Sequence, residues 1–340
     1  MIDDVESVVF SGGGMRGIAF CGSLMALRSW NAGSAMDCAA PGKPPPLFPR
    51  LRRTSGASVG ALFACTTALR ISSEKLFRLI DDEALLDGLV PSVDLSLLQK
   101  DLGLDDGRRL RDSVLRVLEI GIEQWGRSAD DAGTLTLAEL RTLTAVDVNI
   151  STTRLGGLKH DPTDRPKCEI LSADATPDLP VVDALVMSMC VPILYRPVQY
   201  KEGVYVDGGI LNNSPVTRDM VPETTLVLCL APRSLDLEEG LQNYLSMCLY
   251  SGMYFLQEQS IEGFHQKIVV SSASIKTFDF GARREMLVAA VLDGMVGTLS
   301  ALRQLGIKRQ RKEGDAEAAE HSEFIGAQQQ EPLQEAVAPA

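Results

Sequence analysis

Three features that often carry function are scarce in this sequence: histidine, paired cysteine and surplus positive charge. The chain of 340 residues has three histidines, and its seven cysteines show no C-x-x-C spacing and no histidine cluster beside them. This pattern argues against a zinc site and against a disulfide framework, and it is typical of scattered buried thiols in a reducing compartment. We therefore expect a cytoplasmic protein.

Basic residues are outnumbered by acidic ones. Lysine and arginine total 33 against 45 aspartates and glutamates, which gives a formal net charge of −12. Broad nucleic-acid binding needs a basic face that neutralises phosphates. The composition therefore predicts no nucleic-acid partner.

Long apolar runs are absent as well. No window reaches the roughly 18 consecutive apolar residues of a membrane-spanning helix. The nearest, Met286 to Leu305, is interrupted by Asp293 and by glycines, and we expect a buried helix there. The beginning, MIDDVES, is acidic and leads directly into a strand, which predicts no signal peptide. Contact with a membrane is then expected to be peripheral.

Short apolar strands alternate with helices along the chain, which indicates a parallel α/β sheet. Residues 74–145 are amphipathic and mostly helical in pattern, whereas residues 308–340 are too polar to bury a face and are expected to be disordered. We expect a catalytic domain over residues 1–307 and a tail over 308–340. The expected strands are 7–11, 51–55, 145–151, 168–172, 204–206, 225–230 and 267–270, and the expected helices are 18–30, 59–71, 183–189, 241–257 and 282–305.

A glycine-rich loop follows the first expected strand. In the stretch VVFSGGGMRGIAF, residues 8–20, glycine stands at Gly12, Gly13, Gly14 and Gly17. Bare backbone N–H groups at the start of a helix bind either a phosphate or the oxyanion of an acyl-transfer intermediate. The loop alone does not decide between the two.

A serine follows the second expected strand. Gly56, Ser58 and Gly60 form a G-x-S-x-G pattern between strand 51–55 and helix 59–71. This is the context of a nucleophile on a sharp strand-to-helix turn, in which the glycines relieve crowding. We interpret Ser58 as a candidate nucleophile that needs a base to take its proton.

A carboxylate ends a later strand. In GVYVDGGILNNSPV, residues 203–216, Asp207 precedes Gly208 and Gly209. An Asp-Gly turn is the structural alternative. In an open α/β sheet, however, strand ends form the crevice of the site, so Asp207 is a candidate partner of Ser58.

Taken together, these three motifs in this order resemble the patatin-like phospholipase family. The segment SMCVPILYRPV, residues 188–198, is similar to a further motif of that family, with Tyr195 where phenylalanine is usual. The resemblance covers roughly residues 5–230. It implies a three-layer α/β/α fold with a mostly parallel central sheet flanked by helices, with core motifs at 7–230 and a helical insertion at about 74–145.

The resemblance also implies a site. Ser58 is the nucleophile and Asp207 the general base of a dyad without histidine, and the backbone around Gly12, Gly13, Gly14 and Met15 forms the oxyanion hole. Motif support is expected from Arg16, Gly17, Gly56, Gly60, Gly208 and Gly209. The implied substrate is a phospholipid, lysophospholipid or acylglycerol, and neither a metal nor another cofactor is required.

Three other interpretations stay open. Gly12-x-Gly14-x-x-Gly17 also fits a dinucleotide fingerprint, for which Asp37 lies at the distance of a ribose-binding acid. Alternatively, Ser58, Asp207 and His265 stand in the chain order of an α/β-hydrolase triad. A family member that binds lipid without hydrolysing it is a third possibility.

Overall fold

The structure is a computed structural model of the chain, and it describes residues 2–30, 45–79, 88–158, 163–232, 240–277 and 281–305. The chain divides into two compact units, Met1–Thr298 and Leu299–Ala340. The tail predicted over 308–340 lies outside the described residues. The domain limits predicted from the sequence stay a prediction.

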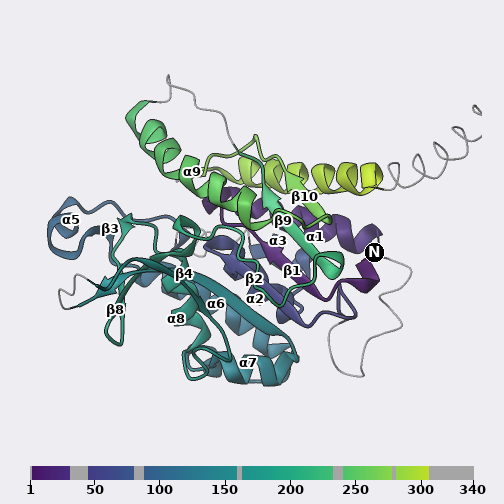
Figure 1. Cartoon of the computed structure of the whole chain (residues 1–340), viewed down its shortest axis with the longest axis horizontal. Coiled ribbons are helices and arrows are strands. Elements are labelled where there is room, and N and C mark those ends of the chain that lie inside the picture. The colour runs from purple at the N-terminus through teal and green to yellow at the C-terminus, as the bar shows by residue number, and fades with distance from the viewer. Residues whose placement is uncertain are drawn as a thin grey trace, which may run out of the picture. The chain divides into compact units, whose positions relative to one another are not determined.

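A sheet of eight strands forms the centre of the first unit (Figure 1). In chain order its strands are β1 (Ser7–Phe10), β2 (Arg53–Ala57), β4 (Asp147–Gly157), β5 (Lys167–Leu171), β7 (Val198–Tyr200), β8 (Gly203–Asp207), β9 (Thr225–Leu230) and β10 (Lys267–Val270). Their order in space is β10-β9-β1-β2-β4-β8-β7, and β5 also pairs with β4. All pairs from β10 to β4 are parallel, whereas β5, β7 and β8 join in antiparallel fashion. The mostly parallel sheet confirms the predicted fold class.

The central strands show why the sequence predicted this sheet. Every residue of β1 and β9 is buried, which is typical of parallel strands that are covered on both faces. The sequence missed β7 and the separate two-stranded sheet of β3 (Gly103–Asp105) and β6 (Ile193–Tyr195). Strands of three residues are too short to show an alternating pattern.

Helices cover the sheet and connect its strands. The α-helices are α1 (Ala19–Trp30), α2 (Val59–Ala68), α3 (Ser73–Arg78), α5 (Leu95–Asp101), α6 (Arg108–Glu123), α7 (Leu137–Thr144), α8 (Val181–Met189), α9 (Gly240–Ser260) and a helix at Arg284–Leu305. Shorter 3-10 helices are η1 (Ile2–Asp4), η2 (Gly14–Ile18), η4 (Ala129–Gly133), η5 (Gly208–Ile210) and η6 (Pro222–Thr224).

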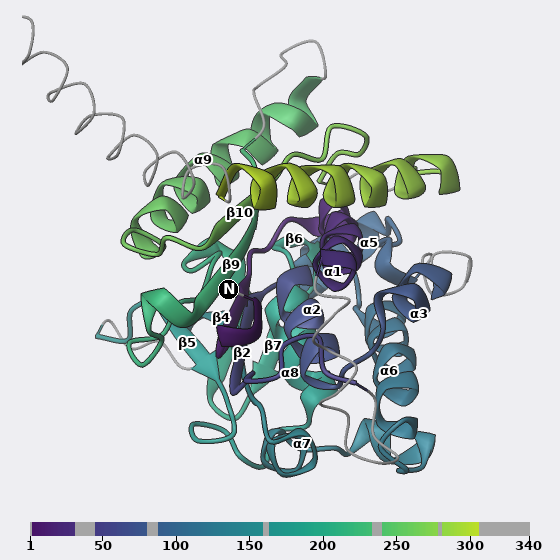
Figure 2. The same ribbon diagram turned by 90° about the vertical axis from the view of Figure 1, so that its right-hand side faces the viewer.

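The main core is formed by one face of the sheet and helices α2, α6, α7 and α8. In α2 every residue except Val59 is buried, so this helix fits a position with protein on all sides. Figure 2 shows α2 and α8 between the strands and α6. On the other face, Val9 and Val227 pack against Ile261 and Phe264, which follow α9. The sheet is therefore the middle of three layers.

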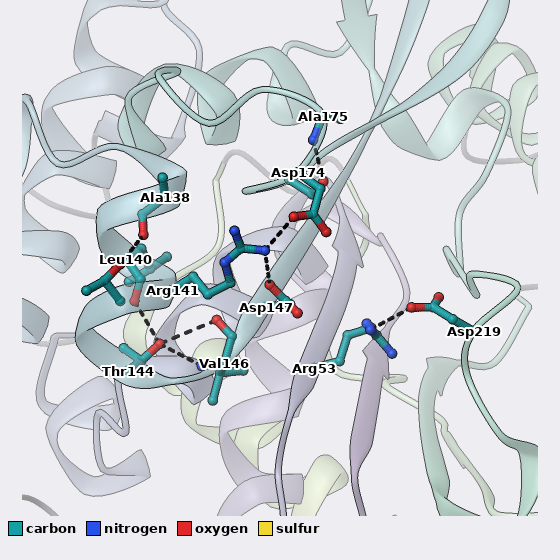
Figure 3. A network of polar contacts seen from close by, with 12 residues as sticks. Arg53, Ala138, Leu140, Arg141, Thr144, Val146, Asp147, Asp174, Ala175 and Asp219 are labelled. Carbon is teal, nitrogen blue, oxygen red and sulfur yellow. Dashed lines mark hydrogen bonds and ion pairs between the residues drawn. The ribbon is translucent and has the colours of Figure 1, made fainter.

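Ion pairs hold the edge at which β2 and β4 begin (Figure 3). Arg141 of α7 contacts Asp147, the first residue of β4, at 3.2 Å and Asp174 at 2.6 Å. Arg53, the first residue of β2, contacts Asp219 at 2.6 Å. Because β2 and β4 both begin here, these ion pairs lie away from the C-terminal ends of the two strands.

The helix at Arg284–Leu305 differs from the expectation of a buried helix. A helix is present, but only 33% of its most apolar window is buried. Within the described residues it is the one helix that is long and apolar enough to cross a membrane by length and composition. A core helix passes the same test, so this observation alone does not establish a membrane span.

The cysteines only partly follow the expectation of buried thiols. The six that lie in the described residues are all free. Four are buried, but Cys168 and Cys248 are exposed. Burial raises the pKa of the Cys21 and Cys65 thiols to about 12, with the nearby charge of Glu74 adding to the rise at Cys21. These two buried groups therefore stay protonated at neutral pH.

We predict that Phe10→Ala lowers the free energy of unfolding by about 3–5 kcal/mol, as expected for truncating a buried aromatic side chain. Phe10 is fully buried and its ring centroid lies 5.5 Å from Phe20 and 6.1 Å from Phe63. Urea denaturation followed by circular dichroism measures the change. Phe255→Ala is the matched control, since Phe255 is 62% exposed; equal losses in both variants would contradict the packing described here.

Candidate active site

The register of the sheet brings Ser58 and Asp207 to the same edge. Phe10 pairs with Gly56, so the glycine-rich loop and Ser58 leave β1 and β2 side by side. Ala57 pairs with Ser151 of β4, and the next residue of β4, Thr152, pairs with Asp207. Because β4 continues beyond β2, it presents Asp207 from the antiparallel strand β8 beside the turn that carries Ser58.

Ser58 occupies a sharp turn between β2 and α2. Its φ of 53° lies in the left-handed region, which is uncommon for a residue with a side chain and is found at functional sites. A Cβ on Gly60 would lie 2.5 Å from the carbonyl oxygens of Phe10 and Ser11, so glycine is required for α2 to start this close to β1. The Ser58 N–H donates to Ser188 Oγ at 2.9 Å, and this hydroxyl donates to the Ser151 carbonyl at 2.6 Å.

Asp207 is a buried carboxyl group with only one oxygen engaged. It is 4% exposed, and its Oδ1 accepts a hydrogen bond from the Gly209 N–H at 2.7 Å. Its Oδ2 has no hydrogen-bond partner in the described part of the chain. Burial raises the pKa of Asp207 to about 6, while the neighbouring Ser58 hydroxyl and the Gly209 N–H act in the opposite direction. The carboxyl group is therefore a stronger base than an ordinary aspartate.

The glycine-rich loop offers fewer free amides than the sequence suggested. The N–H groups of Gly12 and Met15 donate to the carbonyls of Asn213 at 3.0 Å and Thr277 at 2.9 Å, so in this structure they are not available to an oxyanion. Within the described residues, the N–H groups of Gly13 and Gly14 have no such partner. Gly14 has a φ of 55°, which glycine adopts readily. Of the four backbone N–H groups expected in the oxyanion hole, only those of Gly13 and Gly14 are therefore free of such bonds in the described structure.

Arg16 holds the glycine-rich loop in place. Its guanidinium group donates to the Ala231 carbonyl at 2.7 Å and to the Tyr254 hydroxyl at 3.1 Å, and the residue is 2% exposed. These contacts tie the loop to the end of β9 and to α9. Gly17 packs against Val59 at the start of α2. The motif-support role of Arg16 and Gly17 stays a prediction.

Three adjoining cavities extend from this edge. The first, about 40 Å³, contains Gly13, Gly14, Ser58 and Asp207 in its wall. The second, about 70 Å³, shares Gly14 and Ser58 with the first. The third, about 90 Å³, shares Gly14 with both, and its remaining wall is apolar except for a thiol and two hydroxyl groups. Its wall is completed by Met15, Ile18, Cys21, Val59, Leu62, Phe63, Thr66, Leu76, Leu79, Leu89, Ser113, Val117 and Leu287.

The sequence reasoning missed several residues of the site. Ser188 lies in the segment that resembles a family motif, yet its bond to the Ser58 N–H could not be read from the pattern. The backbone carbonyl of Asn213 accepts a hydrogen bond from the Gly12 N–H, and its side-chain amide donates one to the Gln257 side chain of α9 at 2.6 Å. Tyr250, also of α9, lines the first cavity. No local motif marks Tyr250, because it reaches the site only through the packing of α9.

The alternative residues do not join Ser58. His265 is exposed and precedes β10. Because β10 runs parallel to β9 and β1, the beginning of β10 lies at the opposite edge of the sheet. The residue after β2 is Ser58 rather than an acid that could hold a ribose. His160, His321 and the ribose-binding candidate Asp37 lie outside the described residues.

Metal binding has no support among the described residues. They include no group of three or more histidine, cysteine, aspartate or glutamate side chains that could hold a metal ion.

The fold and this site define an α/β protein with a serine, a buried carboxyl group and free amides in one crevice. A family model described as patatin-like phospholipase matches residues 8–219. The chain therefore belongs to the patatin-like phospholipase family.

Two relatives and one solved structure extend the comparison. Uncharacterized protein YqhO of Bacillus subtilis (strain 168) is 27% identical over 222 residues, which span 61% of this chain and 64% of that protein. Probable lipid hydrolase 463L of Invertebrate iridescent virus 6 is 36% identical over 52 residues, 15% of this chain and 18% of that protein. The chain thus spans less than two thirds of these relatives. The crystal structure of VipD from Legionella pneumophila shares the fold, with a TM-score of 0.56 at 18% identity, over 88% of this chain and 67% of that one.

We predict that Asp207→Asn does not destabilise the protein at neutral pH. An acid whose pKa is higher in the folded state binds protons more tightly there, so folding stability falls as pH rises from the unfolded to the folded pKa. A shift of the Asp207 pKa from 3.8 to about 6 lowers the free energy of unfolding by up to about 3 kcal/mol once the pH exceeds the folded pKa. The asparagine side chain of the variant does not ionise, so the variant avoids this loss.

Urea denaturation of both proteins between about pH 4 and pH 7 tests this linkage. The wild type should lose stability relative to the variant as pH rises through this range. Parallel stability curves for the two proteins would show that the Asp207 pKa is not raised by folding.

Proposed function

We propose that the protein is a lipid acyl hydrolase that cleaves fatty-acyl esters through an acyl-Ser58 intermediate. One observation carries the proposal: Ser58, the buried carboxyl group of Asp207 and the free amides of Gly13 and Gly14 line a single cavity. Family membership supports lipid hydrolysis as the class of activity. We expect this activity without a metal or another cofactor.

In the first half of the reaction, the Ser58 hydroxyl attacks the ester carbonyl and its proton passes to Asp207. A carboxyl group with a pKa of about 6 is ionised at neutral pH and accepts a proton more readily than an ordinary aspartate does. Collapse of the tetrahedral intermediate breaks the ester bond, and Asp207 returns the proton to the leaving alcohol.

In the second half, water attacks the acyl-Ser58 ester while Asp207 again takes a proton. The fatty acid leaves, and the proton returns to the Ser58 oxygen. Both tetrahedral intermediates carry a negative oxygen, which the Gly13 and Gly14 amides are suited to bind. Each well-placed donor of this kind is worth roughly 3–4 kcal/mol in acyl transfer.

The apolar cavity beyond Met15 is suited to the acyl chain of the substrate. It adjoins the Ser58 cavity through Gly14 and Val59, and helices α2 and α6 supply much of its wall. An acyl chain buried there would contact Leu62, Leu76 and other side chains of similar polarity. The substrate classes that fit are phospholipids, lysophospholipids and acylglycerols, and we expect the protein to act in the cytoplasm with peripheral access to membranes.

We predict that Ser58→Ala and Asp207→Asn each abolish the release of fatty acids from a mixed lipid extract, measured by mass spectrometry. Activity of the wild type should rise with pH through about 6, since protonated Asp207 cannot accept the Ser58 proton.

His265→Ala is the control that separates a dyad from a triad. It should retain wild-type activity because His265 lies at the other edge of the sheet. Full activity of Asp207→Asn, or complete loss in His265→Ala, would contradict the proposed roles.

The size of the apolar cavity should determine which acyl-chain lengths the enzyme prefers. Val117→Phe should fill part of the apolar cavity and shift the preference of the enzyme toward shorter chains, at an overpacking penalty of about 1–3 kcal/mol. Leu76→Ala should enlarge the cavity from its half-buried position and favour longer chains. Competition between esters of different chain length measures both shifts.

Leu143→Ala provides the control for these variants, since Leu143 is also half-buried at the core but lies outside the cavity wall. It should leave the preference unchanged. An unchanged preference in Leu76→Ala, with the fold intact, would place the acyl chain elsewhere.

A further inference from the structure

Helix α5 presents apolar side chains that are largely exposed, although Leu97 is half-buried. Its sequence is LSLLQKD, and none of its residues is buried. The segment around it and the neighbouring strand β6 carry a group of large exposed aliphatic residues, which we call the apolar rim: Val93 (73% exposed), Leu95 (73%), Leu98 (36%), Leu102 (65%) and Ile193 (56%). In Figure 1, α5 and β3 lie together at the left margin of the first unit.

The apolar rim is continuous across two segments that are far apart in sequence. Gly103 at the start of β3 pairs with Ile193 at the start of β6, and this pairing places Leu102 next to Ile193. An exposed aliphatic group of this kind on a protein surface indicates an interaction site.

Backbone strain marks the same two residues. Leu102 has a φ of 60° and Ile193 a φ of 73°. Asparagine or glycine would adopt this left-handed conformation more easily, and a β-branched residue adopts it rarely. At both positions folding alone would favour a small polar residue, whereas the sequence holds a large apolar one that is exposed to solvent. Strain of this kind is found at functional sites.

A buried carboxylate fixes the base of this projection. Asp105 is 2% exposed and accepts hydrogen bonds from the Ser92 N–H at 2.6 Å, the Ser92 hydroxyl at 2.7 Å and the Gly107 N–H at 2.7 Å. The ends of the segment that contains α5 are thus tied to one side chain. The apolar residues are therefore held outward by a defined loop.

The apolar rim adjoins the wall of the Ser58 cavities. Val191 and Pro192, which line the first cavity, directly precede Ile193. Leu194 and Tyr195, which directly follow it, line the second. A surface that contacts Ile193 therefore lies beside the walls of the two cavities that contain Ser58.

Positive charge accompanies the apolar rim on a protein of net charge −12. A surface hollow of about 570 Å³ beside Leu102 contains four cationic side chains and three carboxylates in its wall. Arg108 and Arg111 pair with Asp106 and Asp183. Lys100 and Arg196 are exposed and form no ion pair within the described residues. Aliphatic side chains flanked by unpaired cations match an anionic lipid surface, in which acyl chains lie beneath phosphate groups.

We propose that the apolar rim, together with Lys100 and Arg196, docks the protein on an anionic phospholipid bilayer so that the Ser58 cavities open toward the lipid. The aliphatic side chains enter the layer of acyl chains, and the two cations contact lipid phosphates. This surface deepens the proposed function and rests on it, because a bilayer is where long-chain substrates are found.

The test compares binding with catalysis in the full chain. The variants are Leu102→Asn, Ile193→Asn and their double variant, because asparagine tolerates a positive φ better than leucine or isoleucine does. Co-sedimentation with vesicles of phosphatidylcholine and phosphatidylglycerol measures docking, and hydrolysis of a water-soluble short-chain ester measures catalysis. We expect the double variant to bind these vesicles about tenfold more weakly or worse, with unchanged hydrolysis of the soluble ester and an equal or higher melting temperature.

Two further variants serve as controls. Val221→Asn removes an aliphatic side chain that is 50% exposed and precedes β9 at the opposite edge of the sheet, so vesicle binding should not change. Lys100→Gln with Arg196→Gln should weaken binding to the mixed vesicles but not to phosphatidylcholine alone, since only the former carry anionic lipid.

The outcomes separate this surface from the proposed reaction. If the wild type hydrolyses the soluble ester while the double variant binds vesicles as well as the wild type does, the docking surface is wrong and the reaction stands. If the double variant instead converts a dimer to a monomer in size-exclusion chromatography without changing vesicle binding, the apolar rim is an interface between two copies and the proposal is overturned. Absence of ester hydrolysis in the wild type contradicts the proposed reaction, whereas the vesicle-binding arm still decides on the surface.

Discussion

The pairing of β4 with β2 on one side and β8 on the other is the constraint on which the candidate site depends. Ser151 and Thr152 are consecutive residues of β4, and they pair with Ala57 and Asp207. Two groups from distant parts of the chain therefore meet at one edge through backbone hydrogen bonds of the sheet. Ser188 strengthens this arrangement, since its hydroxyl joins the Ser58 N–H to the Ser151 carbonyl.

The same edge collects features that oppose folding. Ser58 has a left-handed backbone conformation, and the Asp207 Oδ2 is buried without a partner in the described structure. Strained backbone and unsatisfied polar groups each destabilise a protein by about 1–3 kcal/mol. The fully buried strands β1 and β9 and the apolar helix α2 surround the site, and their packing offsets this loss. In the proposed reaction Asp207 accepts a proton, and the raised pKa that burial gives this carboxyl group would favour that step.

Much of the fold could be predicted because its central elements have strong local signals. The limits of β9 and β10 agree with the predicted strands, and α1, α2 and α9 lie close to their expected positions. The sequence also indicated Ser58 and Asp207, since each stands beside glycines at the end of a strand. It could not indicate that Gly12 and Met15 use their N–H groups elsewhere, because Asn213 and Thr277 reach them only after long-range packing. The sequence could not indicate the exposure of α5 either, because an apolar stretch such as LSLL favours burial, whereas no residue of α5 is buried in the structure.

The central claim is that Asp207 activates Ser58 by taking its proton. The most direct measurement is the rate at which an organophosphonate ester labels Ser58, followed by peptide mass spectrometry as a function of pH. The account predicts labelling at Ser58 whose rate rises with pH through about 6 in the wild type and is nearly lost when Asp207 is replaced by asparagine. Labelling of Ser58 at equal, pH-independent rates in both proteins would contradict it.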